Sequence, residues 1–165
     1  MASEAKRSRR LLGREEKKGR MFDPSLDYGL LPSLTGFALR RASLLDFGGF
    51  GDALGDRSIT PLRYSLIEVV GANPGLQQVQ LAEILGLAKP AATLAIDFWE
   101  SRKCVERRKD ERDRRSYGIF LTPTGKRTLA NLQRLVAEHD KKLTSCLSDA
   151  ELESLHSYLK KIYDQ

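Results

Sequence analysis

Apolar residues recur at roughly helical spacing over most of the chain, and the first such stretch runs from Leu30 to Leu54. Its apolar positions predict a helix, yet three glycines fall inside it, at Gly48, Gly49 and Gly51. Each glycine within a helix costs about 1 kcal/mol relative to alanine. The pattern therefore leaves two alternatives: the helix breaks at the glycines, or another segment approaches its backbone closely there.

The next apolar stretches predict three shorter helices. Thr60 followed by Pro61 is typical of a helix N-cap with proline at the first helical position. Two further helices are predicted over 77–85 and 89–102, with Gly86 in the short connection between them. Because glycine readily adopts the left-handed conformation that ends a helix and turns the chain, this segment predicts a helix-turn-helix.

A strongly basic segment follows the second helix of this pair. Residues 102–115 carry eight Lys or Arg and four Asp or Glu, and residues 117–121 have the apolar pattern of a strand. Acidic residues within a basic run can tie a loop to itself by ion pairs, which leaves the other arginines pointing outward. A stiff basic hairpin directly behind a helix-turn-helix is the arrangement of a winged helix, and it favours contact with nucleic acid.

Composition narrows the possible classes of protein. The 165 residues suffice for one core but hardly for two, and the net charge of +6 is concentrated in residues 1–20 and 102–115. Two cysteines and two histidines do not supply the ligands of a structural zinc site. No apolar run is long enough to span a bilayer, and no cluster of nucleophile and base is visible. We therefore expect a cytoplasmic protein that is not an enzyme, binds no membrane and needs no cofactor.

These segments together resemble the MarR family of ligand-responsive transcriptional regulators. The matching motifs are LAEILGLAKPAA in the helix-turn-helix, CVERRKDERDRRSYGIFLTPTGK through the hairpin, and the closing LSDAELESLHSYLKKI. The wing pattern D-x-R-D-x-R stands at 110–115, followed by L-T-P-x-G at 121–125. The resemblance covers about Leu30 to Tyr163. It implies a mainly α-helical fold with a small β-hairpin wing, in which a winged helix-turn-helix lobe carries long dimerisation helices.

The C-terminal pattern agrees with the homodimer that the resemblance implies. Apolar residues repeat at alternating spacings of three and four from Lys126 to Leu147, a longer seam than one small lobe can cover. Ser148 and Glu151 predict a capping box that starts a last amphipathic helix. A partner helix from a second copy would cover this seam, and an intramolecular hairpin is the alternative.

The predicted organisation therefore has four parts. A basic and flexible arm occupies residues 1–22, and an N-terminal dimerisation helix region occupies 23–58. The DNA-binding lobe follows at 59–124, and the C-terminal dimerisation helices at 125–165. The arm carries eight basic and three acidic side chains in its first 20 residues. It is either a solvated tail or an arm that grips phosphates or the minor groove.

In a complex with double-stranded DNA, the resemblance makes residues 89–102 the recognition helix, which enters the major groove by its N-terminal turn. Relatives usually carry a serine where this chain has Ala88 and an arginine near Leu94. This helix can therefore make few contacts to bases. We expect the wing to supply a larger share of the affinity, and DNA shape to contribute to recognition of the sequence. The candidate contacts on this helix are Lys89, Pro90, Ala91 and Thr93.

The wing supplies the other candidate DNA contacts. The resemblance implies that Asp113 and Arg115 form an ion pair that shapes the loop. A neighbouring arginine, either Arg112 or Arg114, would enter the minor groove. Strand alternation should send one of the two arginines on the incoming strand toward solvent and phosphate. The candidate contacts of the hairpin are Arg107, Arg108, Arg112, Asp113, Arg114 and Arg115.

The resemblance also implies a small effector bound between the dimerisation helices and the lobe. Aromatic side chains with several arginines suit an anionic aromatic ligand, such as a benzoate- or cinnamate-type acid or its coenzyme A thioester. Such a ligand would release a repressor from a pseudo-palindromic operator, in the control of aromatic-compound catabolism. The alternative is that the aromatics belong to the core and the arginines grip phosphate. The candidate residues are Phe37, Arg40, Arg41, Leu44, Phe47, Arg63 and Tyr64.

Two other functions stay open. Cys104 and Cys146 could make the regulator respond to thiol oxidation, with Cys104 expected in the core and Cys146 in the last turn of the long helix. Alternatively, the winged helix could bind RNA or a protein, which a monomeric state in solution would favour. The sequence does not decide between a repressor and an activator, and it does not identify the operator.

Overall fold

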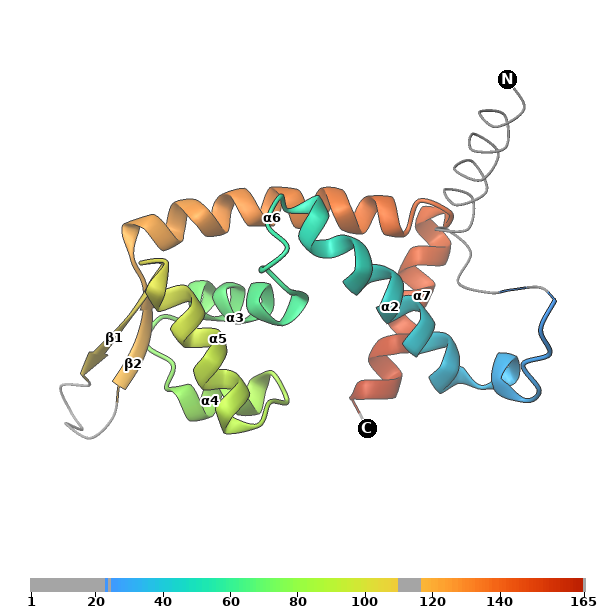
Figure 1. Cartoon of the computed structure of the whole chain (residues 1–165), viewed down its shortest axis with the longest axis horizontal. Helices are drawn as coiled ribbons and strands as arrows, with labels where there is room; N and C mark the ends of the chain where they lie inside the picture. The colour runs from blue at the N-terminus through green and yellow to red at the C-terminus, as the bar shows by residue number, and fades with distance from the viewer. Residues whose placement is uncertain (1–22, 24, 110–116, 165) are drawn as a thin grey trace, which may run out of the picture. The chain divides into compact units, whose positions relative to one another are not determined.

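The computed structural model describes residue 23 and residues 25–109 and 117–164 (Figure 1). It divides into two units, Met1–Leu45 and Asp46–Gln165. The described part of the first unit holds the short helix η1, Leu31–Ser33, and the beginning of α2, Thr35–Ala53, which crosses the boundary. The second unit is mainly helical with one two-stranded hairpin, so the predicted fold class is confirmed.

The second unit begins with the helices that the sequence predicts. Its elements in chain order are α3 Pro61–Ala72, α4 Gln78–Ile84, α5 Lys89–Ser101, β1 Val105–Lys109, β2 Tyr117–Leu121, α6 Pro123–Leu143 and α7 Asp149–Tyr163. The Thr60 side chain accepts a hydrogen bond from the backbone N–H of Arg63, which confirms the predicted N-cap. Gly86 adopts the left-handed conformation with φ 61°. It confirms the corner of the helix-turn-helix, at which α4 and α5 are bent by 112°.

The core of this unit collects apolar side chains from each of its helices and strands except α7. Trp99 of α5 is fully buried, and its indole N–H donates a hydrogen bond of 2.7 Å to the backbone carbonyl of Arg63 on α3. Both strands of the hairpin contribute to the same cluster, and so does the first half of α6. The main buried side chains are Leu66, Ile67, Val70, Leu81, Ile96, Trp99, Val105, Ile119, Leu129 and Leu132.

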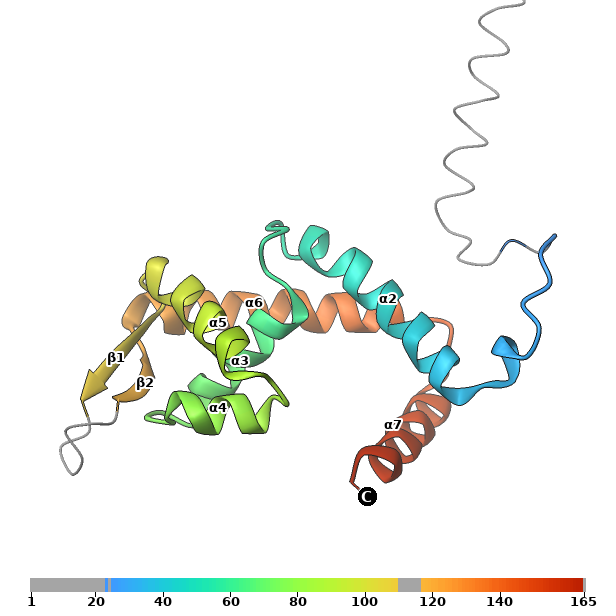
Figure 2. The ribbon, with the colours of Figure 1, turned by 60° about the horizontal axis from the view of Figure 1, so that its bottom comes forward.

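Backbone hydrogen bonds join the two strands of the hairpin and attach β2 to the rest of the lobe. β1 and β2 pair antiparallel with Val105 opposite Leu121 and Lys109 opposite Tyr117. On the other edge of β2, the backbone of Ile119 exchanges two 2.9 Å hydrogen bonds with the segment before α4, at Gly75 and Leu76. Figures 1 and 2 show the hairpin beside α5 at the N-terminal end of α6.

The glycines of α2 do not break the helix, which continues to Ala53. Two of the three, Gly49 and Gly51, allow close approach instead, which was the second alternative. A Cβ atom on Gly49 would lie 3.2 Å from the His139 ring of α6, and one on Gly51 would lie 2.7 Å from the Cα atom of Arg57. His139 is also joined to this part of α2 by a 3.0 Å contact between its Nε2 atom and a carboxylate oxygen of Asp46.

The long C-terminal helix differs from the expectation at both ends. It begins at Pro123, because the Thr122 hydroxyl caps it by accepting from the backbone N–H of Gly125 at 3.0 Å. It ends at Leu143, where the following Thr144 hydroxyl bonds back to the Asp140 carbonyl. The placement of Cys146 in its last turn is therefore wrong, since that residue lies in the connection to α7. The capping box of Ser148 and Glu151 at the start of α7 is confirmed.

Within the described ranges, no single helix is long and apolar enough to cross a membrane. Only α4 and α5 taken together reach the required length and composition, and these two are bent sharply against each other.

Candidate nucleic-acid interface

Helix α5, the expected recognition helix, has one buried face and one exposed face that is apolar in its first half. Ala92, Ile96 and Trp99 are fully buried against the lobe. Lys89 and Pro90 are exposed, Ala91 is half-buried, and Leu94 is 68% exposed. Ala88 at the N-cap makes no side-chain capping bond, as expected for its departure from the family pattern. Of the candidate contacts on this helix, Lys89 and Pro90 are exposed, while Ala91 and Thr93 are half-buried.

Thr93, the remaining candidate on α5, is half-buried and has its hydroxyl engaged within the lobe. It donates to the Lys89 carbonyl at 3.0 Å and accepts from the side-chain amide of Gln78 on α4 at 2.7 Å. This contact joins the two helices of the helix-turn-helix near their N-terminal ends. A hydroxyl that already donates its single proton can only accept from a base.

Arg107 connects the hairpin to the recognition helix. Its guanidinium forms ion pairs with Asp97 at 2.5 Å and with Glu100, both on the outward face of α5. The arginine side chain is only 26% exposed. Arg107 therefore holds the base of the wing against the recognition helix, and its charge is largely compensated there.

Arg108, the next residue on β1, points outward, which confirms that alternation exposes one of the two arginines. Its side chain is 56% exposed, pairs with Glu106, and stacks over the Phe120 ring of β2 at 4.8 Å from the ring centroid. Stacking on an aromatic ring holds a guanidinium extended in water. The remaining wing candidates, Arg112 to Arg115, and the basic arm at 1–22 lie outside the described residues.

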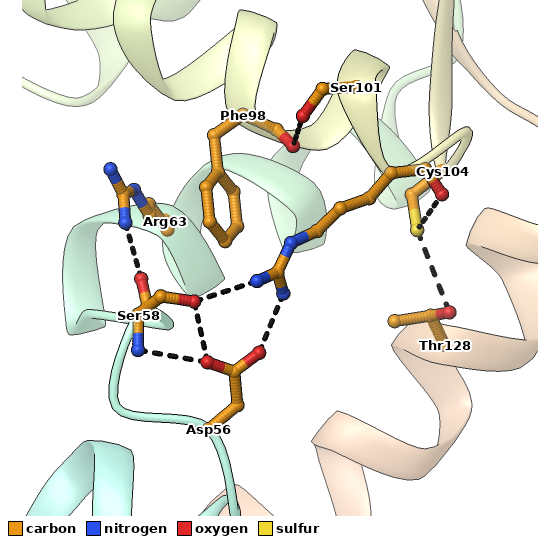
Figure 3. Close-up of polar contacts among 8 residues, drawn as sticks. Asp56, Ser58, Arg63, Phe98, Ser101, Cys104 and Thr128 are labelled. Atoms are coloured by element: carbon orange, nitrogen blue, oxygen red, sulfur yellow. Dashed lines mark hydrogen bonds and ion pairs between the residues drawn. The ribbon is translucent and has the colours of Figure 1, made fainter.

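The C-terminal end of α5 is fixed by a second polar cluster, which Figure 3 shows. The Arg102 guanidinium donates to Asp56 at 2.7 Å and to the Ser58 hydroxyl at 2.8 Å. Phe98 lies between Arg102 and Arg63, with its ring centroid 4.1 Å and 4.0 Å from the two guanidinium carbons. The turn between α2 and α3 is thereby tied to the last turn of the recognition helix.

This cluster predicts an acid-sensitive contribution to stability. Hydrogen bonds from Ser58, and then from Arg102, lower the pKa of Asp56 from 3.8 to about 2. A carboxylate with a lowered pKa stabilises the fold above its ordinary pKa and loses that contribution as pH falls from about 4 to 2. Because the pair is partly exposed and screened by solvent, we expect Asp56→Asn to lower the free energy of unfolding by about 1 kcal/mol at pH 7.

Urea unfolding of both proteins between pH 7 and pH 2 measures this difference, which should shrink in the acid range. Asp52→Asn is the matched control, because Asp52 pairs with Arg57 on the surface, where the two side chains are 56% and 85% exposed. We expect it to leave stability nearly unchanged at both pH values, because water screens this exposed pair. A difference between Asp56→Asn and wild type that is equal at pH 7 and pH 2 would contradict the role of this carboxylate.

The effector candidates of the first unit lie on one helix. The guanidinium carbon of Arg41 is 5.7 Å from the ring centroid of Phe37, one turn earlier on α2. Arg40 is exposed, and Leu44 is 49% exposed. Phe47, in the second unit, is 58% exposed although it is aromatic. The helix therefore presents arginines and exposed apolar side chains together.

Arg63 and Tyr64 on α3 are engaged within the second unit. Arg63 stacks on Phe98 and donates to the Ser58 carbonyl at 2.5 Å. Tyr64 donates its hydroxyl proton to Glu68 at 2.9 Å, and burial with this bond raises the pKa of Tyr64 to about 12. An effector that uses either group would have to replace these contacts.

Neither cysteine lies in a disulfide. Cys104 is buried at the start of β1, as expected, and its thiol is 3.6 Å from the Thr128 hydroxyl. Cys146 is exposed. Among the described side chains, no group of three or more His, Cys, Asp or Glu could hold a metal ion.

Several interface residues could not be found from the pattern alone. The sequence suggests that Asp97 and Glu100 are solvated charges on a helix. It suggests that Gln78 is an ordinary residue of a first helical turn. Their partners lie 7 to 15 residues away, while the partners of Arg102 lie 44 and 46 residues away. The one available signal was the i, i+3 spacing of Asp97 and Glu100, which places both on the same face of α5.

Comparison with known proteins agrees with this geometry. Residues 58–116 match the model of the MarR family. A protein of Thauera aromatica named as a transcriptional regulatory protein for the hcr operon is 30% identical over 141 residues, 85% of each chain. The transcriptional repressor CouR bound to a 23-mer DNA duplex is 35% identical, with a TM-score of 0.79 over 84% of this chain and 99% of that chain.

CouR bound to p-coumaroyl-CoA is 32% identical, with a TM-score of 0.76 over 84% of this chain and 98% of that chain. Similarity of this extent over nearly the whole of each relative, together with the winged helix and its basic hairpin, places the chain among transcriptional regulators and not among enzymes. The chain belongs to the MarR family of transcriptional regulators.

Proposed function

We propose that this regulator is a homodimeric repressor that binds a pseudo-palindromic operator and is released by the coenzyme A thioester of an aromatic acid. The observation that carries the DNA-binding part is the pairing of an exposed recognition helix with a basic hairpin held against it by Arg107. Similarity to a repressor solved on a 23-mer duplex supports the same assignment.

In this proposal the recognition helix enters the major groove with Lys89, Pro90, Ala91 and Thr93. Arg108 contacts the phosphate backbone from β1, and either Arg112 or Arg114 enters the adjacent minor groove. Arg107 acts indirectly, because its charge is held by Asp97 and Glu100. The basic arm at residues 1–22 adds phosphate contacts outside the lobe. Backbone contacts position such a protein on the duplex, while base contacts supply its specificity.

The dimer is supported by apolar surface that the described residues of one chain leave uncovered. The first half of α6 packs Leu129 and Leu132 into its own lobe, but Leu143 at its end is 36% exposed. On α7, an amphipathic helix, a row of apolar side chains is exposed, and isolated helices of this length are marginal in water. The exposed members are Leu155 at 39%, Tyr158 at 62%, Ile162 at 46% and Tyr163 at 72%. A second copy of the same helices would cover them.

The effector is proposed from charge and aromatic character. Arg40 and Arg41 offer guanidinium groups to the phosphates of coenzyme A, and Phe37 and Leu44 offer an apolar surface to an aromatic acyl group. CouR, 32% identical, has been solved with p-coumaroyl-CoA. An effector that binds the DNA-free conformation more tightly than the DNA-bound one shifts the protein toward the DNA-free conformation. DNA binding is weakened by the ratio of the effector's two affinities.

A mobility-shift titration tests the proposal on a duplex enriched by the protein from a random pool. We expect p-coumaroyl-CoA or benzoyl-CoA to release the duplex, and coenzyme A alone or the free acids to be far weaker. Replacing Arg40 and Arg41 together with glutamine should raise the thioester concentration needed for release on the order of tenfold or more, since a hydrogen bond to a charged group contributes about 1.5–3 kcal/mol.

Arg57→Gln is the control, because Arg57 is an exposed arginine paired with Asp52. It should leave release by the thioester unchanged. If calorimetry detects no binding by any aromatic acid or thioester, the effector proposal is wrong while the DNA-binding proposal stands. Release that depends on oxidant and disappears when both cysteines are replaced by serine would support the thiol-responsive alternative instead.

A further inference from the structure

Most polar side chains of the recognition helix are already engaged within the lobe. Asp97 and Glu100 are paired with Arg107, and the Ser101 hydroxyl donates to the Phe98 carbonyl. Thr93 is engaged with Gln78 and with the carbonyl of Lys89. Among the polar side chains of α5, only the Lys89 ammonium has no hydrogen bond or ion pair with the described residues.

Apart from Lys89, the exposed side chains in the first half of this helix are apolar. Leu94 is 68% exposed in the middle of the helix, although leucine is ordinarily among the most buried residues. Pro90 and Ala91 lie one turn earlier, at the i−4 and i−3 positions, so the three side chains share one face. Lys89, at the start of the same helix, supplies the positive charge that a duplex attracts.

The major groove offers one apolar group on the base edges, which is the C5 methyl of thymine. We propose that Leu94, supported by Pro90 and Ala91, determines operator specificity by packing against thymine methyl groups. This inference rests on the proposed DNA-binding function. It explains how a helix whose polar side chains are mostly engaged within the lobe can distinguish sequences: bases with a methyl group bury the leucine, and bases without one leave it in water or in an unfilled space.

Replacing thymidine by deoxyuridine tests this directly, because uracil keeps every hydrogen-bonding group of thymine and lacks only the methyl. The probe is a duplex enriched by the wild-type protein from a random pool, remade with deoxyuridine at each half-site. Burial of one methyl-sized group corresponds to roughly fourfold in affinity. We therefore expect about fourfold weaker binding for one substituted contact and roughly fifteenfold for one contact in each half-site.

Leu94→Ala separates the leucine from the duplex itself. Alanine is the best helix former, so this exposed substitution should leave folding intact. The variant should bind the thymidine and deoxyuridine duplexes equally. Ile84→Ala is the matched control, since Ile84 is another exposed aliphatic residue, 56% exposed, on the preceding helix α4. This control should retain the full preference for thymidine.

Equal binding of the two duplexes by the wild type would overturn the inference. A thymidine preference that survives in Leu94→Ala would also overturn it, because the preference would then come from duplex shape. Failure of the protein to enrich any duplex would contradict the proposed DNA-binding function itself. This outcome is distinguishable from the two results above, which both require an enriched duplex.

Discussion

Gly125→Ala is expected to lower the free energy of unfolding by about 3 kcal/mol or more, the upper range for forcing extra atoms into a packed site. A Cβ atom at Gly125 would lie 1.8 Å from the carbonyl oxygen of Cys104 and 2.8 Å from its carbonyl carbon. Both are backbone atoms, so no side-chain rotation can relieve the overlap. The first turn of α6 would have to move away from the start of β1.

The same site also depends on Thr122. Its hydroxyl accepts from the Gly125 backbone N–H and donates to the Lys103 carbonyl at 2.6 Å, so the overlap would displace the helix cap as well. Urea or thermal unfolding measures the loss of stability. For a chain of this size, 3 kcal/mol corresponds to a fall in Tm of about 10 °C.

Gly48→Ala is the matched control. A Cβ atom at Gly48 meets nothing within 4 Å among the described residues, and the residue lies within helix α2. Because glycine in a helix is less favourable than alanine by about 1 kcal/mol, this control should be as stable as the wild type or slightly more stable. Equal stability of Gly125→Ala and Gly48→Ala would show that α6 and β1 are not in the described contact.

Replacing Arg112 and Arg115 together with alanine is expected to weaken binding to any duplex on the order of 100-fold. One hydrogen bond to a charged group, at about 1.5 kcal/mol, lost from each of the two wings amounts to about 3 kcal/mol for the dimer. The effect should be largest at low salt. Fewer counterions would then be released from the duplex. The slope of log affinity against log salt concentration should therefore decrease by about one for each phosphate that the wing no longer neutralises.

Fluorescence anisotropy with an enriched duplex and an unrelated duplex, at several salt concentrations, measures both effects. The control removes two charges elsewhere, with Arg134→Gln and Lys142→Gln on the exposed surface of α6. That variant should keep most of the affinity. An unchanged affinity of the wing variant at fixed salt would contradict the assignment of the hairpin to DNA.

Local signals made most of the fold predictable. The Thr60 cap, the left-handed Gly86 and the capping box at Ser148 each depend on residues a few positions apart, and all three are present. The end of α6 was not predictable from its apolar repeat, because the repeat continues beyond Leu143 while backbone bonding stops there. Apolar spacing reports which side chains are buried, and it does not report where a helix stops.

The site was predictable only in part, for a different reason. Exposure of Lys89 and of one strand arginine follows from helical and strand periodicity. The ion pairs of Arg107 with Asp97 and Glu100 do not follow from periodicity, because they require the hairpin to fold back against α5. The stacking of Arg63 on Phe98, 35 positions later in the chain, was equally unpredictable from local sequence.

The two halves of α5 have different roles, and this affects how the DNA specificity of such a regulator can change in evolution. Arg107 is held by Asp97 and Glu100 in the second half of the helix, while Lys89, Ala91 and Leu94 lie in the first half, where none of them is fully buried. We expect substitutions at these three positions to leave the attachment of the wing and the core unchanged. With the proposed DNA-binding role, a duplicated copy of the gene would then acquire a new operator by single substitutions, without passing through an unstable intermediate.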